Sequence, residues 1–303
     1  MEHIIEVNHL RKVYGETVAV EDVSFNVRQG EIFGIVGPNG AGKTTTIESI
    51  IGLRKPDGGS VQVLGIEPQK QPRELSNRIG IQLQQAAIPE RLKVWEALDL
   101  YASFYDRTVP WQPLIEEWGL ADKRNTPFGK LSGGQQQRLF IALALLNDPE
   151  IVFLDELTTG LDPQARRATW DLVRAIRDQN KTVVLITHFM DEVQALADRV
   201  AIIDNGRLIA LDTPQALVAD LGAETRVHFS LQNGFDANVL QDVEGVTAVS
   251  QQNRQVNIQG NGPLLANIAT ALSKYNIAPS DLSVEQANLE DVFLALTGRA
   301  IRA

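Results

Sequence analysis

Apolar and polar residues follow two patterns along the chain, and each pattern predicts a different kind of strand. Residues 18–20 and 23–27 alternate between apolar and polar, as half-buried antiparallel strands do. Residues 151–154 are continuously apolar, as a strand buried on both faces of a parallel sheet is, and residues 182–186 form a second such run. The chain therefore predicts an α/β fold with a mixed sheet whose antiparallel part lies near the N-terminus.

A helical pattern interrupts this succession of strands between about residues 94 and 120. Its apolar positions include Phe104 and three of the four tryptophans, Trp95, Trp111 and Trp118. An aromatic stripe at helical spacing is usually part of a core, and we expect the same here. The pattern predicts a helical insertion, at about residues 88–145, within the larger part of the chain.

The chain changes character after a predicted linker at residues 222–224. From residue 226 to residue 286, strand and helix patterns follow one another in the order β-α-β-β-α-β, with the first helix at residues 237–243, and a last helix is predicted at residues 289–296. That order is the ferredoxin-like arrangement. We therefore expect a large domain at residues 1–222 and a small α+β domain, ferredoxin-like in topology, at residues 223–303.

Composition excludes several kinds of protein. The 303 residues carry a net charge of -10, which argues against a nucleic-acid partner, because proteins that bind nucleic acids normally present basic surfaces. Without cysteine, the chain forms neither disulfides nor thiolate metal sites. It has no run of about 18 apolar residues to span a membrane, and its first residues lack the features of a signal peptide. Any function at a membrane would therefore need a separate membrane-spanning chain.

The stretch at residues 37–45, Gly-Pro-Asn-Gly-Ala-Gly-Lys-Thr-Thr, has the form of a phosphate-binding P-loop between an apolar run and a helix-like segment. Its glycines allow the backbone to approach an anion, so that N–H groups of the loop and of the helix start can surround the phosphates. In this pattern Lys43 reaches the β- and γ-phosphates, and the Thr44 hydroxyl binds Mg²⁺. The alternative is a glycine turn with an incidental Lys-Thr pair, and the flanking strand and helix argue against it.

A second glycine-rich stretch, Leu-Ser-Gly-Gly-Gln, lies at residues 131–135. Ser132 and Gln135 have the spacing of a capping box at the start of a helix. Gly133 and Gly134 in the first turn lower helix stability compared with alanine. They are explained if the exposed N–H groups of this helix start meet an anionic ligand, and a well-capped helix without a ligand is the alternative.

Polar side chains follow two of the predicted buried strands. Asp155 and Glu156 end the run at residues 151–154, where two carboxylates are costly to bury without a partner. Mg²⁺ and a water molecule would satisfy them, and a helix cap is the alternative for Asp155. His188 follows the next buried strand, where ligands bind in open α/β sheets, although a single histidine is more often structural.

Taken together, these motifs resemble the ATP-binding cassette (ABC) ATPases over roughly residues 3–220. The resemblance rests on five motifs in the family's order: residues 37–45 (Walker A), 131–135 (the signature), 151–156 (Walker B), 160–162 (the D-loop) and His188 (the switch histidine). Gln84 lies where the family has its Q-loop glutamine. Tyr14 lies where the family has an adenine-stacking aromatic, although its residue type and loop position alone favour covering the sheet edge. Residues 289–294, Leu-Glu-Asp-Val-Phe-Leu, resemble the C-terminal extension of the drug- and antibiotic-exporter subgroup.

The resemblance implies the fold of a P-loop NTPase of the ABC cassette type and a role for each matching residue. Catalysis is assigned to Glu156 as general base, with His188 and Lys43 at the γ-phosphate. Mg²⁺ is assigned to Thr44, Gln84 and Asp155, directly or through water. The residues that it implies for nucleotide binding are Tyr14, Gly37, Pro38, Asn39, Gly40, Ala41, Gly42, Lys43, Thr44, Thr45, Gln84, Ser132, Gly133, Gly134 and Gln135.

The resemblance also implies how such a site would be used. Family members form head-to-tail dimers, so the partners expected here are ATP with Mg²⁺, a second copy of the chain and an integral membrane permease subunit. The expected function is ATP hydrolysis that drives transport from the cytoplasmic face of the cell membrane, with export as the expected direction. The alternatives are a soluble ABC ATPase without a transport role and a regulatory nucleotide switch, and the presence of Glu156 and His188 argues against the switch.

The sequence departs from the family pattern at one position of this site. The family usually has proline after Glu156, whereas this chain has Leu157 followed by Thr158. Proline would stiffen the turn, so its absence raises a question about the rigidity of the loop. The chemistry is not in question, because the carboxylate and the histidine are both present.

Overall fold

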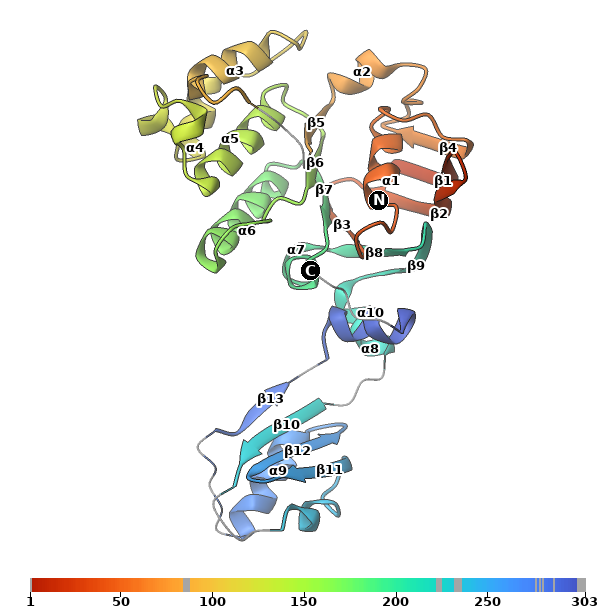
Figure 1. Cartoon of the computed structure of the whole chain (residues 1–303), viewed down its shortest axis with the longest axis vertical. Coiled ribbons are helices and arrows are strands. Elements are labelled where there is room, and N and C mark those ends of the chain that lie inside the picture. The colour runs from red at the N-terminus through yellow and green to blue at the C-terminus, as the bar shows by residue number, and fades with distance from the viewer. Residues whose placement is uncertain are drawn as a thin grey trace. The chain divides into compact units, whose positions relative to one another are not determined.

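The computed structural model describes residues 2–83, 88–221, 225–231, 236–275, 281–285 and 287–298, together with residues 277 and 279. Contacts divide the chain into two compact units, one made mainly of residues up to 215 and the other of residues 216–295 (Figure 1). Each unit has a sheet and a hydrophobic core of its own.

The described part of the first unit contains a nine-stranded mixed sheet in the order β4-β1-β2-β9-β8-β3-β7-β6-β5. Strands β4, β1 and β2 are antiparallel, and β8, β3, β7, β6 and β5 are parallel. Strand β9 joins the two parts, because it pairs with β8 antiparallel and with β2 parallel. The strands are β1 (His3–Tyr14), β2 (Thr17–Arg28), β3 (Ile32–Val36), β4 (Gly58–Val63), β5 (Ile79–Gln82), β6 (Ile151–Asp155), β7 (Thr182–Thr187), β8 (Arg199–Asp204) and β9 (Arg207–Asp212).

The burial of these strands follows the sequence patterns that predicted them. Every residue of β3, β6 and β7 is buried, which confirms that the continuous apolar runs are strands covered on both faces. In strand β2, residues 23–28 alternate between buried and half-buried positions. It is one continuous strand where two shorter stretches were predicted, because pairing with β1 continues from Thr17 to Arg28.

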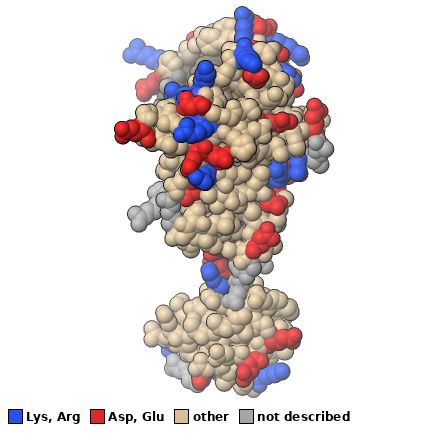
Figure 2. Space-filling view, turned by 90° about the vertical axis from the view of Figure 1, so that its right-hand side faces the viewer, with Lys and Arg blue, Asp and Glu red and all other residues tan. Residues whose placement is uncertain are grey.

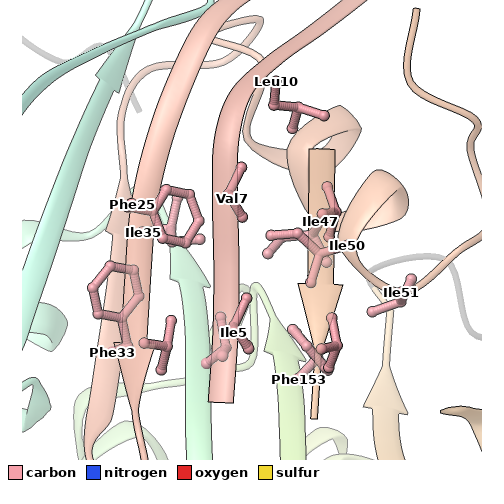
Figure 3. Close-up of a cluster of buried hydrophobic side chains, with 14 of the residues drawn as sticks. Ile5, Val7, Leu10, Phe25, Phe33, Ile35, Ile47, Ile50, Ile51 and Phe153 are labelled. Atoms are coloured by element: carbon pink, nitrogen blue, oxygen red, sulfur yellow. The ribbon is translucent and has the colours of Figure 1, made fainter. Parts of the chain in front are cut away.

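Helix α1 (Lys43–Ile50) packs between the antiparallel strands and the parallel ones, and the core of the unit lies around it. Figure 3 shows Ile47 and Ile50 of α1 beside Ile5 and Val7 of β1, with Phe153 of β6 below them. The two rings of Phe25 and Phe33 stack in the same core, with centroids 5.2 Å apart. Further helices of this unit are α2 (Pro72–Ser76), α6 (Pro163–Asp178) and α7 (Met190–Leu196).

The helical insertion is formed by α3 (Val94–Ala102), α4 (Trp111–Glu117), two 3₁₀ turns, η1 (Ala121–Lys123) and η2 (Phe128–Lys130), and α5 (Gly133–Leu145). In Figure 1 these helices lie on the other side of β5–β7 from the antiparallel strands. Trp111 and Trp118 are buried, as expected of a core stripe. Phe104, which was expected in the same stripe, is 70% exposed, because it lies beyond the end of α3.

The second unit contains a four-stranded antiparallel sheet in the order β11-β12-β10-β13. Its strands are β10 (Thr225–Ser230), β11 (Val246–Gln252), β12 (Gln255–Gly260) and β13 (Ser283–Glu285). Helix α9 (Leu264–Lys274) and a 3₁₀ turn, η3 (Ala237–Leu240), supply the rest of its core. The chain also forms α8 (Pro214–Asp220) before this sheet and α10 (Leu289–Thr297) after it.

The α-helix predicted at residues 237–243 is only the four-residue 3₁₀ turn η3. Its two buried residues, Ala237 and Leu240, are three positions apart, which matches the three residues per turn of a 3₁₀ helix. The side chain of Asp236 accepts a hydrogen bond from the backbone N–H of Asn238 and fixes the start of the turn. Because this segment has so little apolar surface to bury, extending the turn into an α-helix would not stabilise it.

Charged side chains of both signs are interspersed over the first unit on the face that Figure 2 shows. The small unit presents mostly uncharged side chains on that face. Among the described helices, none is both long enough and apolar enough to cross a bilayer.

Candidate functional site

The order of the parallel strands brings the predicted chemical groups to one edge of the sheet. Strands β3, β7, β6 and β5 are consecutive neighbours and all run parallel. Their carboxyl ends therefore lie side by side, where ligands bind in open α/β sheets. The P-loop follows β3, His188 follows β7, and the Asp155-Glu156 pair ends β6. Residues far apart in the sequence thus meet at one site.

The P-loop has a backbone that only glycine permits at two of its positions. Gly42 has a φ of 99°, and a Cβ atom there would lie 2.4 Å from the carbonyl oxygen of Ala19. A Cβ atom on Gly37 would lie 2.0 Å from the carbonyl oxygen of Ile203 on β8. The neighbouring strands therefore require these glycines, and the loop passes directly into the N-terminus of α1.

Lys43, the first residue of α1, is buried within the loop that it completes. Its Nζ donates hydrogen bonds to the carbonyl oxygens of Gly37, at 2.7 Å, and Pro38, at 3.0 Å. Burial lowers the pKa of Lys43, and the nearby carboxylates of Glu156 and Asp155 partly oppose that shift. The ammonium group is therefore held over the loop, in the field of the acidic pair.

The groups assigned to magnesium are partly placed by the structure. Asp155 is the last residue of β6 and is 3% exposed. Thr44 is exposed at the start of α1, next to Lys43, and Thr45 is half-buried behind it. Gln84 lies outside the described residues. A hydroxyl and a carboxylate near a phosphate loop are oxygen ligands of the kind that Mg²⁺ prefers.

Glu156 and His188 contact each other directly. The Oε1 atom of Glu156 lies 3.1 Å from Nδ1 of His188, and both side chains are largely buried. The Glu156 backbone has a φ of 51°, and its N–H donates to the carbonyl oxygen of Ile186 on β7. This hydrogen bond fixes the turn at the end of β6. Leu157 lies at the position where the family usually has proline, and it is fully buried. Its packing therefore holds the turn that a proline ring would otherwise stiffen.

The signature stretch forms the predicted helix start. The Ser132 hydroxyl accepts from the N–H of Gln135, and the Gln135 side chain accepts from the N–H of Ser132, which confirms the capping box. A Cβ atom on Gly133 or Gly134 would meet nothing closer than 3.8 Å. The packing of the chain itself therefore does not require glycine at these two positions.

The signature stretch shares a surface cavity with the D-loop. The cavity has a volume of about 390 Å³. No P-loop residue is among those that line it, which are Ser132, Gly133, Gly134, Gln135, Arg138, Gly160, Leu161, Asp162, Ala165 and Thr169. Asp162 also caps α6 by accepting hydrogen bonds from the N–H groups of Gln164 and Ala165. Within one chain, the signature and the P-loop thus belong to separate surfaces.

Tyr14 is the last residue of β1, where a loop position was predicted, and it is 41% exposed. The ammonium of Lys12 and the guanidinium of Arg54 lie 5.4 Å and 6.0 Å from the centre of its ring. An exposed aromatic ring flanked by cations offers a flat surface next to positive charge.

Sequence reasoning missed one buried polar group near this site. Glu192 on α7 is fully buried, as is Thr158, two residues after Glu156. A signal was present in the sequence, since Glu192 shares the helical i, i+3, i+4, i+7 face of Phe189, Val193 and Leu196. An acidic residue on an apolar helix face indicates a buried carboxyl group.

The P-loop, the acidic strand end and the histidine at adjacent carboxyl ends define the class of protein. This is the nucleotide site of an α/β P-loop NTPase, in which phosphates bind a glycine-rich loop at a helix start. The additional antiparallel strands, the helical insertion and the capped signature helix distinguish the chain from a plain P-loop domain.

Comparison with known proteins narrows the class. The model of the ABC transporter family matches residues 20–159. The chain is 34% identical to the Nod factor export ATP-binding protein I of Ralstonia nicotianae, in an alignment that covers 99% of this chain and 95% of the relative. It is 38% identical to the daunorubicin/doxorubicin resistance ATP-binding protein DrrA of Streptomyces peucetius. That alignment covers 97% of this chain and 92% of the relative.

Solved structures agree with these relatives. The chain resembles the ATP-binding subunit of an ABC transporter with a TM-score of 0.65 and 29% identity, over 72% of this chain and 93% of that structure. A dimeric bacterial ABC transporter cassette matches with a TM-score of 0.61 and 27% identity, over 69% of this chain and 98% of the cassette. The chain belongs to the ATP-binding proteins of ABC transporters. It is an ABC-type ATPase that energises transport, in the exporter group of these relatives.

Proposed function

We propose that two copies of this chain bind ATP and Mg²⁺ in a head-to-tail dimer and hydrolyse ATP to drive export through a separate membrane permease. The observation that carries the proposal is the meeting of the P-loop, the Asp155-Glu156 pair and His188 at one sheet edge. Phosphoryl transfer needs positioned groups and charge neutralisation more than covalent chemistry, and this edge supplies both.

For ATP binding, the loop N–H groups and Lys43 hold the β- and γ-phosphates, and Tyr14 stacks on the adenine. Two of the three N–H donors of Lys43 bond carbonyl oxygens of the loop, so the ammonium group is already held over the loop where a phosphate would bind. The remaining loop residues, Pro38, Asn39, Gly40, Ala41 and Thr45, shape the phosphate cradle. An exposed Tyr14 ring next to two cations supports the stacking role.

Mg²⁺ is assigned to the Thr44 hydroxyl and Asp155, together with Gln84. The described oxygen donors fit this ion, because Mg²⁺ in nucleotide sites takes one or two protein oxygens and completes its shell with phosphates and water. When bound, Mg²⁺ would neutralise charge on the β- and γ-phosphates. Asp155 is held at the end of a fully buried strand, so its carboxylate has little freedom to leave the site.

For hydrolysis, Glu156 accepts a proton from the attacking water or polarises it, and His188 orients Glu156 and reaches the γ-phosphate. The contact of 3.1 Å between Oε1 and Nδ1 supports this pairing. The backbone N–H bond of Glu156 to the neighbouring strand limits the movement of the carboxylate. A base held in place loses little entropy on reaching the transition state.

A second copy supplies the other half of each site. Gly133 and Gly134 have room for a side chain in the single chain, so the ligand that needs their N–H groups lies outside it. We assign that ligand as the γ-phosphate bound to the partner's P-loop, contacted by the capped helix start of Ser132 to Gln135. The similarity to a dimeric ABC transporter cassette supports a dimer of this kind.

The membrane partner and the location follow from the family. One relative is described as a Nod factor export protein and another as a daunorubicin and doxorubicin resistance protein, and the chain matches nearly the full length of both. We therefore place this chain on the cytoplasmic face of the membrane, against a permease that receives it at the helical insertion. Leu100 and Phe104, exposed at the end of α3, supply apolar contact surface there.

We propose residues 1–222 as the cassette and residues 223–303 as an accessory domain. The division of contacts near residue 215 supports a boundary in this region. The accessory domain is ferredoxin-like in its strand order, because its first and third strands, β10 and β12, are central and antiparallel to their neighbours. Its first helix is reduced to the turn η3.

The proposal is tested first by ATPase activity of the purified chain. Glu156→Gln should keep ATP binding and lose at least about 100-fold in kcat, because the amide cannot accept the proton. Glu150→Gln is the matched control, since Glu150 precedes the same strand at its other end and pairs with Arg78 at the surface. Hydrolysis that survives Glu156→Gln would overturn the assignment of the base.

The proposed role in transport is tested by purifying the chain from detergent-solubilised membranes. A tagged chain should bring with it an integral membrane protein, and that complex should hydrolyse ATP faster than the chain alone. If no membrane protein copurifies with the tagged chain, an ABC ATPase without a transport role becomes the better assignment.

A further inference from the structure

A buried carboxyl group lies behind the catalytic pair and takes no part in the function proposed above. Glu192 is the third residue of α7 and has no exposed surface. Its Oε1 accepts a hydrogen bond from Nε1 of Trp170 on α6, at 3.3 Å. Within the described residues, its Oε2 is buried without a hydrogen-bond partner of good geometry. A buried carboxyl of this kind is costly unless the fold uses it.

Two threonine hydroxyls complete the surroundings of this carboxyl. Burial raises the pKa of Glu192, Asp191 adds to the shift, and the hydroxyls of Thr187 and Thr158 oppose it together with Trp170. Among the residues that the structure describes, no basic group takes part in that balance. The Thr158 hydroxyl is itself buried, and in the described part of the chain it has no hydrogen-bond partner of good geometry. The Oε2 atom of Glu192 and the hydroxyl of Thr158 thus lie near each other, and a small shift would let them form a hydrogen bond.

Each neighbour of the Glu192 carboxyl belongs to a segment that carries part of the site. Thr158 follows Glu156 by two residues in the turn after β6, and Thr187 directly precedes His188 at the end of β7. Trp170 is on α6, the helix that begins at the D-loop residue Asp162. A single side chain therefore touches the segments of the base, of the histidine and of the D-loop.

A second set of contacts joins the same two helices. The guanidinium of Arg166 on α6 lies 4.4 Å from the centre of the Phe189 ring, and its NH1 pairs with Asp191 at 3.2 Å. The Phe189 ring lies in turn 4.0 Å from the His188 ring. Helices α6 and α7 are thus joined on their exposed side as well as at the buried carboxyl.

We propose that Glu192 is a positioning residue of ATP hydrolysis, whose carboxyl ties Thr158, Thr187 and Trp170 into one arrangement and so fixes the Glu156–His188 pair relative to the D-loop. The inference rests on the proposed function, which gives Glu156 and His188 their roles. A second copy that contacts Asp162 would act on α6, and the Glu192 carboxyl passes that displacement to the catalytic pair.

The proposal is tested by steady-state ATPase kinetics of full-length variants. Glu192→Ala should lower kcat about 10- to 100-fold, because the catalytic pair loses its support, and should leave KM for ATP within about twofold. Glu192→Gln should restore most of kcat, since its amide oxygen accepts from Trp170 and its NH₂ group can donate to Thr158. Asp171→Ala is the matched control, because Asp171 adjoins Trp170 on α6 but its side chain is 77% exposed.

Two milder variants keep the test decisive if Glu192→Ala does not fold. Trp170→Phe and Thr158→Val each remove one hydrogen-bonding group while keeping the bulk of the side chain, and each should lower kcat about three- to tenfold with KM unchanged. A kcat within about twofold of the parent in both would overturn the proposal. So would equal losses in Glu192→Gln and Glu192→Ala, which would mean that the carboxylate charge matters and the hydrogen bonds do not.

The outcome is separate from that of the proposed function. If Glu156→Gln retains hydrolysis, the assignment of the base fails and the role of Glu192 fails with it. If Glu156→Gln loses hydrolysis while Glu192→Ala, Trp170→Phe and Thr158→Val all keep theirs, only the positioning role fails.

Discussion

The P-loop and the signature helix are both glycine-rich, but different neighbours explain their glycines. In the P-loop, a Cβ atom on Gly37 would lie 2.0 Å from a backbone oxygen of β8, and one on Gly42 would lie 2.4 Å from a backbone oxygen of β2. In the signature helix, a Cβ atom on Gly133 or Gly134 would meet nothing closer than 3.8 Å. The first pair is constrained by the chain's own fold, and the second pair is not.

This difference separates the two halves of the proposed site. The P-loop is fully formed in the single chain. Lys43 donates hydrogen bonds to its carbonyl oxygens, and strands pack around it. The signature helix is equally well formed, with its capping box closed, but its first turn lies at the surface, with Gly133 exposed and Gly134 half-buried. Substitutions in the P-loop should therefore damage folding and binding together, whereas substitutions in the signature should damage only activity.

The largest effect on folding is expected from Gly37→Ala. The added methyl group must displace Ile203 on β8 or the loop itself, and neither is at the end of a flexible side chain. We expect a loss of about 3 kcal/mol in the free energy of unfolding, together with weaker ATP binding. Urea unfolding and titration with a fluorescent ATP analogue measure both. A variant as stable as the parent would mean that the loop has more freedom than the structure gives it.

The next largest effect is expected from Gly134→Ala, on activity alone. The methyl group has room in the chain, and alanine in a helix is more stable than glycine, so the free energy of unfolding should stay the same or rise by up to about 1 kcal/mol. ATPase activity should nevertheless fall about 100-fold, because the methyl group blocks the approach of a phosphate to the N–H groups. Kinetics and urea unfolding of one preparation test both parts.

Mixing two inactive variants provides the control for that prediction. In a head-to-tail dimer of Gly134→Ala with Glu156→Gln, one of the two sites combines an intact P-loop and base with an intact signature. If subunits exchange freely, half of the dimers are mixed, so about a quarter of the parent activity should return. No recovery on mixing would contradict the assignment of the signature to the partner's site.

A smaller effect is expected from Gly40→Ala, which separates conformation from crowding in the P-loop. Gly40 has a φ of 80°, but a Cβ atom there would meet no atom within 4 Å. The substitution should therefore cost only the strain of the left-handed backbone, about 1 kcal/mol, measured by urea unfolding. A loss as large as that of Gly37→Ala would show that strain, and not collision, dominates in this loop.

The smallest effect is expected in the pH dependence of stability, from Glu192. Burial raises the pKa of this carboxyl above its ordinary value of 4.5, so the folded chain keeps the proton to a higher pH than the unfolded chain. Its contribution to stability is therefore greatest below 4.5 and is lost as pH rises through the raised pKa of the folded state. Glu192→Gln cannot titrate. The stability of the parent relative to this variant should fall across that window, as urea unfolding at a series of pH values would measure.

Several elements of the fold could be predicted because local chemistry determines them. The continuous apolar run at residues 151–154 became the fully buried β6, and the Ser132–Gln135 spacing became a closed capping box. Both depend on residues within a few positions of one another. The turn η3 was predicted as an α-helix because the pattern of residues 237–243 does not reveal how little apolar surface that segment has to bury.

The sequence by itself determined which chemical groups the protein has: the P-loop with Lys43, the acidic pair, the histidine and the signature glycines. These follow from residue types at short spacings, so they can be read without a structure. Only the tertiary structure decided which groups meet, since the order β3-β7-β6 depends on how the whole sheet pairs. The sequence places Glu192 on the apolar face of a helix, but only the tertiary structure supplies its neighbours, because Trp170, Thr187 and Thr158 come from three different segments.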